Sequence, residues 1–370
     1  MFDALPPPLN SVVPFLIVLG VLVFIHELGH YLAARWRGVH VEAFSIGFGR
    51  AIFSWTDRRG TVWKLSWLPL GGYVKLHGQE QPEDADDATK AAWKAGRTFH
   101  EKSVLSRAIV IAAGPVANFV LAAALFAGLF AVMGRPVVTS QIGEVVASSA
   151  AARSGLLVGD VVTAIDGQVI GRFDQLRQIV GAHPGQALKL HVVRGDQALD
   201  LTVTPDSKMI GGVATGLLGV RGGATVFEPI STVAALGAGV TQTWDVTVQT
   251  FDGVIGMITR RTSADDMGGP LRIAQMSGQV ASLGFASLVS FIAILSVNLG
   301  LLNLFPIPVL DGGHLVFYAF EALRGRPLPM RAQEYGYRAG FAVLIGLFVF
   351  ATWNDLGHLG LFRWVAGLIG

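Results

Sequence analysis

The chain has 370 residues, of which 52% are hydrophobic and only 15% are charged, a composition too apolar for an ordinary soluble protein of this size. Its formal net charge of +2 provides no basic surface of the kind that nucleic acids require. Because the chain contains no cysteine, disulfides and thiolate metal sites are excluded, and any metal must be held by His, Asp or Glu.

The stretch from Ser11 to Ala34 is long enough to cross a bilayer, and its only side chains that ionise between about pH 4 and pH 7 are His26, Glu27 and His30. On a helix the two histidines face the same way, which suits two imidazole ligands of zinc, and Glu27 lies beside them as a candidate base. The alternative is a chance match on a solvated helix face, but burial in hydrocarbon costs several kcal/mol and disfavours it. Residues 1–34 are therefore predicted to form a first transmembrane helix that carries a zinc motif.

Residues 35–107 are predicted to form a cytoplasmic loop with a membrane-associated β-hairpin. Within it, strand-like runs over 41–75 flank the turn Asp57-Arg58-Arg59-Gly60. This hairpin is either a cap with interfacial tryptophans or an edge to which an extended peptide can be added, and both interpretations stay open. The acidic segment from Gln79 to Asp87 is predicted to be a solvated loop.

Three further apolar stretches predict transmembrane helices at 108–133, 283–310 and 339–356. Positive charge is concentrated in 35–107 and 311–338, so the positive-inside rule places these two segments in the cytoplasm. Residues 134–282 and both termini, including the tail 357–370, are then extracytoplasmic. The histidine motif consequently lies nearer the cytoplasmic face.

The extracytoplasmic part contains one compact unit at 136–222, predicted to be α+β from its alternating strand-like runs and turn signals. The segment from Ala151 to Gly167 closely resembles bacterial PDZ domains, which bind peptide ends by strand addition beside a carboxylate-binding loop. Gly143, in the matching position Ile142 to Val145, is therefore a candidate substrate-binding residue. A folded spacer that only limits access to the membrane is the open alternative. Residues 223–282 are expected to be amphipathic connecting helices.

A second polar cluster runs from Asn303 to His314. Pro306 and Pro308 remove backbone donors, which is tolerable at membrane depth only where the freed carbonyls face protein or a water-filled cavity. Asp311 follows the two prolines and could complete a three-ligand zinc site with the two histidines, leaving a fourth position open to water. Alternatively, Asp311 is an interfacial residue that enters a Gly-Gly turn.

Taken in order, these motifs resemble the bacterial site-2 intramembrane metalloproteases of the regulator-of-sigma-E protease type, in peptidase family M50. The features that carry the resemblance are His26 to His30, Gly47-Phe48-Gly49, Leu68 to Lys75, the PDZ-like unit and Asn303 to His314. They cover nearly the whole chain. The implied fold is a polytopic α-helical membrane protein with about four transmembrane helices, a membrane-associated β-hairpin region and one PDZ domain. The best-known members carry two tandem PDZ domains, so a double-domain size filter is in doubt here.

The resemblance implies a zinc endopeptidase of the bacterial inner membrane. Such enzymes cut single-span membrane proteins, namely anti-sigma factors and remnant signal peptides, after another protease has trimmed their outer domain. Carried over by position, the zinc ligands are His26, His30 and Asp311, the base is Glu27, and the substrate-binding residues are Asn303, Gly47 and Gly49. Zinc lowers the pKa of bound water toward about 7, and Glu27 would accept its proton. The main alternative function is a catalytically inactive scaffold that carries a PDZ domain. A metal-dependent transporter is a weaker alternative, because it would show more spans and internal repeats.

Overall fold

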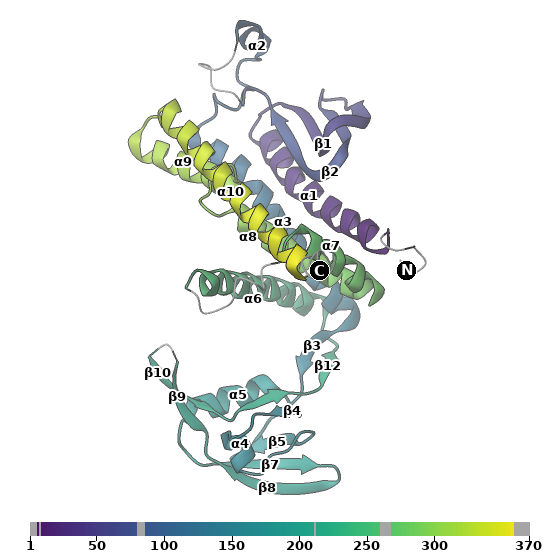
Figure 1. The fold of residues 1–370 in the computed structure, drawn as a ribbon, viewed down its shortest axis with the longest axis vertical. Coiled ribbons are helices and arrows are strands. Elements are labelled where there is room, and N and C mark those ends of the chain that lie inside the picture. Colours follow the sequence, from purple (N-terminus) through teal and green to yellow (C-terminus); the bar gives the residue numbers. More distant parts are fainter. Residues whose placement is uncertain (1–5, 7–8, 80–85, 211, 260–267, 359–370) are drawn as a thin grey trace, which may run out of the picture. The chain divides into compact units, whose positions relative to one another are not determined.

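The computed structural model describes residue 6 and residues 9–79, 86–210, 212–259 and 268–358. The chain divides into two compact units (Figure 1). The helical unit comprises residues 1–129 and 236–370, and the β-rich unit comprises residues 130–235. Most of the acidic segment from Gln79 to Asp87, and most of the tail 357–370, lie outside the described residues.

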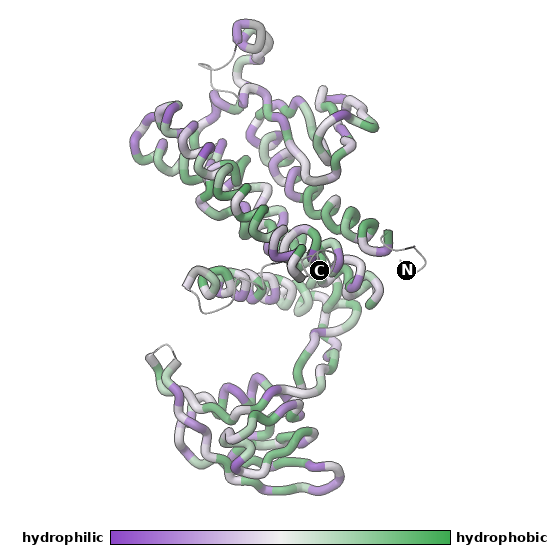
Figure 2. Tube along the Cα trace, in the orientation of Figure 1, coloured by the Kyte–Doolittle hydropathy of each residue, from purple (hydrophilic) through white to green (hydrophobic). Residues whose placement is uncertain are grey.

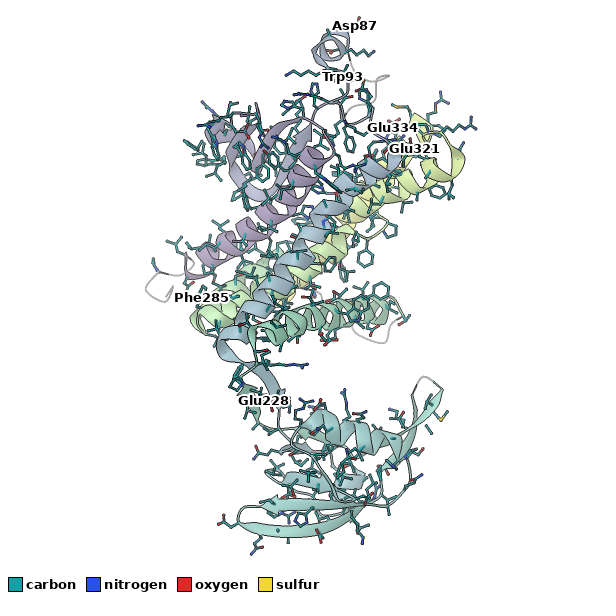
Figure 3. The ribbon with its side chains drawn as sticks, turned by 180° about the vertical axis from the view of Figure 1, so that it is seen from behind. Asp87, Trp93, Glu228, Phe285, Glu321 and Glu334 are labelled. Atoms are coloured by element: carbon teal, nitrogen blue, oxygen red, sulfur yellow. The ribbon has the colours of Figure 1, made fainter. Side chains whose placement is uncertain are left out.

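Among the described residues, four helices are long and apolar enough to cross a membrane, as the sequence predicts: α1 (Leu9–Trp36), α3 (Val104–Met133), α8 (Phe285–Asn303) and α10 (Met330–His358). Hydrophobic residues predominate along these helices (Figure 2). The shorter or more polar helices are α2 (Asp87–Ala92), α6 (Thr232–Ile258), α7 (Pro270–Ser282) and α9 (Asp311–Arg324). Figure 3 shows Glu321 and Glu334 at one end of the helical unit, whereas Phe285 begins α8 at the other end.

The two C-terminal spans differ in length from the sequence prediction. Helix α8 ends at Asn303 rather than at 310, because Pro306 and Pro308 supply no backbone donors to continue it. Helix α10 begins at Met330, well before 339. Its polar first turns include an ion pair between Glu334 and Arg338, which lie four residues apart on one helix face.

The core of the helical unit has two apolar clusters. One joins α1 to α7 and α8 through Val18, Leu22, Ala281, Leu288, Phe291 and Ile292. The other joins α1 and α3 to the hairpin through Tyr31, Ala34, Val41, Phe44, Leu76, Val110 and Ile111. Together they fix α1 against each of the elements that surround its histidines.

Strands β1 (Val41–Thr56) and β2 (Val62–Leu76) form an antiparallel pair that curls back on itself. Ala43 lies opposite both Val62 and Lys75, so the first half of β1 is flanked by both ends of β2. The bend is at Gly47, whose φ of +87° and close approach to Leu68 O exclude a side chain. As a result, residues 72–76 pair with β1 on one side only and form an outer edge of this sheet.

The β-rich unit contains a four-stranded antiparallel sheet in the order β6-β5-β7-β8. The strands of the whole β-rich unit are β3 (Arg135–Val138), β4 (Ile142–Val145), β5 (Val161–Ile165), β6 (Gln168–Val169), β7 (Leu188–Arg194), β8 (Gln197–Val203), β9 (Asp206–Ile210), β10 (Val213–Leu217), β11 (Val220–Gly222) and β12 (Thr225–Glu228). Helices α4 (Ala150–Arg153) and α5 (Phe173–Ala182) complete it. Leu176 of α5 is buried in the same core as Leu190 and Val192 of β7.

Candidate metal centre

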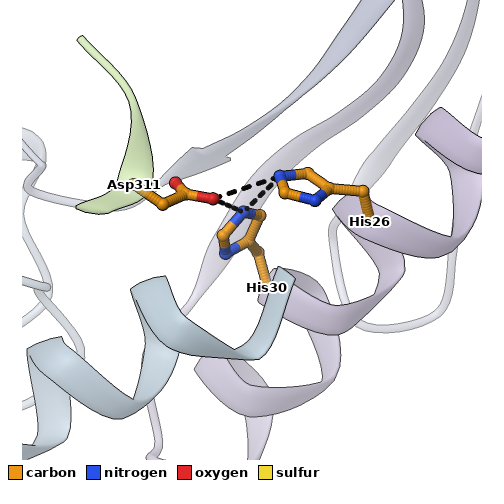
Figure 4. A group of neighbouring side chains, drawn as sticks. All are labelled: His26, His30 and Asp311. Atoms are coloured by element: carbon orange, nitrogen blue, oxygen red, sulfur yellow. Dashed lines mark hydrogen bonds and ion pairs between the residues drawn. The ribbon is translucent and has the colours of Figure 1, made fainter. Parts of the chain in front are cut away.

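Three donor atoms from two distant parts of the chain converge on one point (Figure 4). His26 and His30 lie on one face of α1, and their Nε2 atoms are 3.2 Å apart. Asp311, the first residue of α9, places Oδ2 3.2 Å from His26 Nε2 and 3.4 Å from His30 Nε2. Both imidazoles are buried.

This triangle has the dimensions that a tetrahedral zinc ion requires. With ligand distances of about 2.0–2.1 Å, two donors of a tetrahedral site lie roughly 3.3–3.4 Å apart, close to the three separations measured here. Asp311 Oδ2 is also buried without a hydrogen-bond partner, and coordination of a cation would compensate for this. Two imidazoles and one carboxylate are a donor set of catalytic zinc sites, in which the fourth position stays open. The residues present therefore fit zinc.

Helix α3 contacts the Nδ1 atoms of both imidazoles, on the side away from the three donor atoms. His30 Nδ1 donates to the carbonyl oxygen of Val110 over 2.9 Å, so the proton is on Nδ1 and the Nε2 lone pair points into the triangle. His26 Nδ1 lies 3.2 Å from the side-chain amide of Asn118, which is fully buried. Ser296 of α8 donates to the backbone carbonyl oxygen of Asn118 over 2.8 Å. Such outer contacts commonly fix the orientation of a metal-binding imidazole.

The backbone leading to Asp311 is strained. Val309 has a φ of +96°, in a region that β-branched residues rarely occupy. Strain of this kind costs about 1–3 kcal/mol and persists only where the surrounding structure imposes it. Here the segment between α8 and α9 turns sharply after its two prolines. As a result, the Asp311 carboxylate lies next to the imidazoles of His26 and His30.

Glu27 lies beside the triangle and is not one of its three donors. Strand β2 passes directly over it, because the Cβ position of Gly72 would be 3.1 Å from Glu27 Cγ. The Glu27 carboxylate also accepts a hydrogen bond from the backbone N–H of Val74. The outer edge formed by residues 72–76 is therefore next to this carboxylate.

The other predicted site residues are not in recorded contact with the three donors among the described residues. Asn303, at the end of α8, donates its side-chain amide to Leu299 O over 3.0 Å. Gly47 and Gly49 lie in β1, both with positive φ. Gly143 belongs to the β-rich unit, where a methyl group on it would lie 2.5 Å from Gly223 Cα.

Sequence reasoning missed Asn118 and Gly114 of α3. A methyl group on Gly114 would lie 2.3 Å from His30 Nε2, so this position must lack a side chain for the imidazole to fit. A signal was present for Asn118, since it is the only strongly polar side chain between 108 and 133. Polar groups in apolar spans are expected to be functional, but nothing in the sequence shows which partner one of them contacts.

Comparisons with known proteins agree with this chemistry. The model of the family described as "Peptidase family M50" matches residues 14–347. A protein of Rhizobium meliloti named as a zinc metalloprotease is 45% identical, over 93% of this chain and 96% of its own length. Metalloprotease MmpA of Caulobacter vibrioides is 38% identical, over 97% and 98%. The regulator of sigma E protease of Salmonella typhi is 32% identical, over 93% and 98%.

Proposed function

The chain belongs to peptidase family M50 and is a zinc metalloprotease, and from this premise we propose that it cleaves peptide bonds within the membrane. The observation that supports this best is the triangle of donors in a unit with four candidate membrane-spanning helices. The comparisons confirm the family and the zinc cofactor that the sequence predicts. The substrates and the role of each residue are our proposal.

We assign His26, His30 and Asp311 as the residues that hold zinc. The bound ion would supply Lewis acidity and an acidic water at the open fourth position. Glu27 then accepts the proton of the attacking water and delivers it to the leaving amine. The bond from the Val74 N–H to Glu27 limits the rotation of this carboxylate and keeps it beside the three donors.

Asn118 is assigned as the residue that orients His26. For His26 Nε2 to bind a metal, its proton must be on Nδ1, and Asn118 must then present an acceptor to it. The contact in the structure is made by Asn118 Nδ2. A half turn of the amide, whose two ends have nearly the same shape, puts Oδ1 in this position. His26 and His30 would then have matching tautomers, each held by α3.

The substrate is proposed to bind in extended form. An intact helix keeps its peptide carbonyls in intrahelical hydrogen bonds, so a transmembrane substrate must unwind locally before water can attack. The edge at 72–76 offers backbone groups for strand addition next to Glu27. In this proposal Gly47 and Gly49 shape the bend of the sheet, and Asn303 contacts the substrate near the scissile bond.

The β-rich unit is proposed to be a PDZ domain on the extracytoplasmic side. Both edges of β4 are occupied, by β11 and by bonds between Ile142 and residues 159–160, so the proposed peptide site moves away from Gly143. Among the described residues, the second edge of β11 has no ladder partner, and Gly222 of β11 packs against Phe173 of α5. We place a bound peptide along this edge. The alternative role of the domain is to exclude bulky substrates from the membrane site without binding a peptide.

The proposed substrates are single-span proteins of the bacterial inner membrane, namely trimmed anti-sigma factors and remnant signal peptides. The name of the Salmonella typhi relative, a regulator of sigma E protease, supports this class. The distribution of positive charge supports an active site near the cytoplasmic face, with 35–107 and 311–338 in the cytoplasm.

The test compares purified wild type with Glu27→Gln, using a single-span peptide in vesicles and metal analysis of the same samples. Glu27→Gln is expected to retain one zinc per chain and lose cleavage, whereas Asp311→Asn loses both. Full activity in Glu27→Gln would refute the role of Glu27. Absence of stoichiometric zinc from the wild type would favour the inactive scaffold.

A further inference from the structure

A basic cleft of about 450 Å³ lies at the C-terminal end of α1. Three separate segments contribute to it: the last turn of α1, the β1–β2 turn and the loop before α3. Its charged lining consists of Arg35, Arg58, Arg59 and Arg97, with His40 between them. Among the residues that the structure describes, no acidic side chain lines it.

The positive charge of this cleft is largely uncompensated. In the described parts of the chain, none of its four arginines takes part in a recorded ion pair. Asp57 of the hairpin turn accepts hydrogen bonds from the backbone N–H groups of Arg59 and Thr61 and from Trp63 Nε1. It also accepts one from the Tyr31 hydroxyl, to which Arg35 donates, so Arg35 reaches this carboxylate only through Tyr31. Burial, followed by the nearby Lys94 ammonium, lowers the pKa of His40. The lining of the cleft therefore carries four positive side chains even when the imidazole is neutral.

Two apolar side chains are exposed on the last turns of α1, the helix that contributes Arg35 to the cleft. Trp36 is 73% exposed and Leu32 is 56% exposed, and both flank Arg35 on the last turns of this apolar helix. Exposed tryptophans at the end of a span are typical of the level where lipid headgroups meet acyl chains. The end of α1 thus carries both an arginine of the cleft and exposed side chains suited to hydrocarbon.

Membrane orientation alone does not require this arrangement. The positive-inside effect depends on how many cations flank a span and not on their convergence. Bringing four guanidinium groups from three segments into one concavity costs mutual repulsion, which an anion offsets. Guanidinium groups bind phosphate through paired hydrogen bonds, and phosphate is the anionic group present at this depth of a bilayer.

We propose that this cleft binds the phosphate headgroup of an anionic phospholipid, with an acyl chain lying along Leu32 and Trp36. The site is separate from the proposed zinc ligands and does not depend on catalysis. It ties the hairpin, and with it the edge at 72–76, to the membrane surface. An acidic cytoplasmic peptide could use the same cations but would not need the apolar surface on α1.

The experiment is native mass spectrometry of the purified full-length protein with phosphatidylglycerol or phosphatidylcholine of identical acyl chains. The wild type is expected to retain phosphatidylglycerol preferentially. The double variant Arg58→Gln, Arg59→Gln is expected to bind it about thirtyfold more weakly, the factor for two cations near an anionic headgroup. The double variant Arg50→Gln, Arg331→Gln has the same net charge and alters exposed arginines outside the cleft, so it should bind as the wild type does.

Three results would overturn the proposal. They are equal retention of the two lipids, an equal loss in both double variants, and full displacement of phosphatidylglycerol by equimolar inorganic phosphate or by an acidic peptide. Circular dichroism and zinc content, measured on each variant, show whether the fold is intact. Because phosphate shares the headgroup chemistry but lacks acyl chains, weak competition by it supports a lipid as the ligand.

Discussion

Replacing Gly114 by alanine should abolish zinc binding while leaving α3 helical. The added methyl carbon would lie 2.3 Å from His30 Nε2 and 2.9 Å from His26 Cε1. Non-bonded carbon contacts are comfortable at about 3.5 Å or more, so the His30 ring must move by roughly 1 Å. Zinc tolerates errors of only about 0.2 Å in its ligand distances, so such a shift removes Nε2 from the site.

Gly114→Ala should lower the zinc affinity more than a mutation of a residue that only hydrogen-bonds to a zinc ligand. Changes to residues that only orient a ligand weaken metal binding about 10–100-fold, and Gly114→Ala displaces the ligand itself, so we expect a loss above about 100-fold. Overpacking costs about 1–3 kcal/mol, but alanine gains about 1 kcal/mol over glycine in a helix interior. The variant should therefore fold with only a modest loss of stability.

Gly128→Ala is the matched control, because it lies on the same helix with no heavy atom within 4 Å of the added carbon. Zinc content after desalting, zinc affinity by competition with a chromophoric chelator, and helicity are measured for both variants. The reasoning is refuted if Gly114→Ala binds zinc like the wild type, or if Gly128→Ala loses zinc to the same extent.

Two further predictions concern Asn118 and Asp160. Asn118→Ala should weaken zinc binding about 10–100-fold, whereas Asn118→Asp, which still offers an acceptor to His26 Nδ1, should largely retain it in the same chelator competition. Equal losses would contradict the orienting role. In the β-rich unit, the bond from Arg194 holds the pKa of the buried Asp160 below its ordinary value. Ionised Asp160 thus stabilises this unit above about pH 4, and this contribution is lost as the pH falls through the lowered pKa. Hydrogen–deuterium exchange in β5 and β7, corrected for its intrinsic pH dependence, should show this loss in the wild type and not in Asp160→Asn.

The hairpin illustrates a partial success of sequence reasoning. Its two strands and its turn follow from alternation and turn residues, and the structure has them at β1 and β2. Its curling does not follow, because the second pairing of Ala43 depends on a bend at Gly47 and on packing against α1. Consequently, the sequence could indicate an edge strand but not that residues 72–76 form the edge beside Glu27.

The sequence by itself determined the chemistry and the membrane setting. Helical periodicity puts His26 and His30 on one face, and an apolar span of sufficient length predicts a membrane helix, because both properties depend on neighbours along the chain. The sequence names Asp311 as a candidate third ligand, but only the tertiary structure brings it to these histidines. Only the tertiary structure, likewise, places Asn118 beside His26 and brings four arginines into one cleft. Such contacts join segments far apart in sequence, and their geometry is set by how helices and strands pack against one another, which no local pattern encodes.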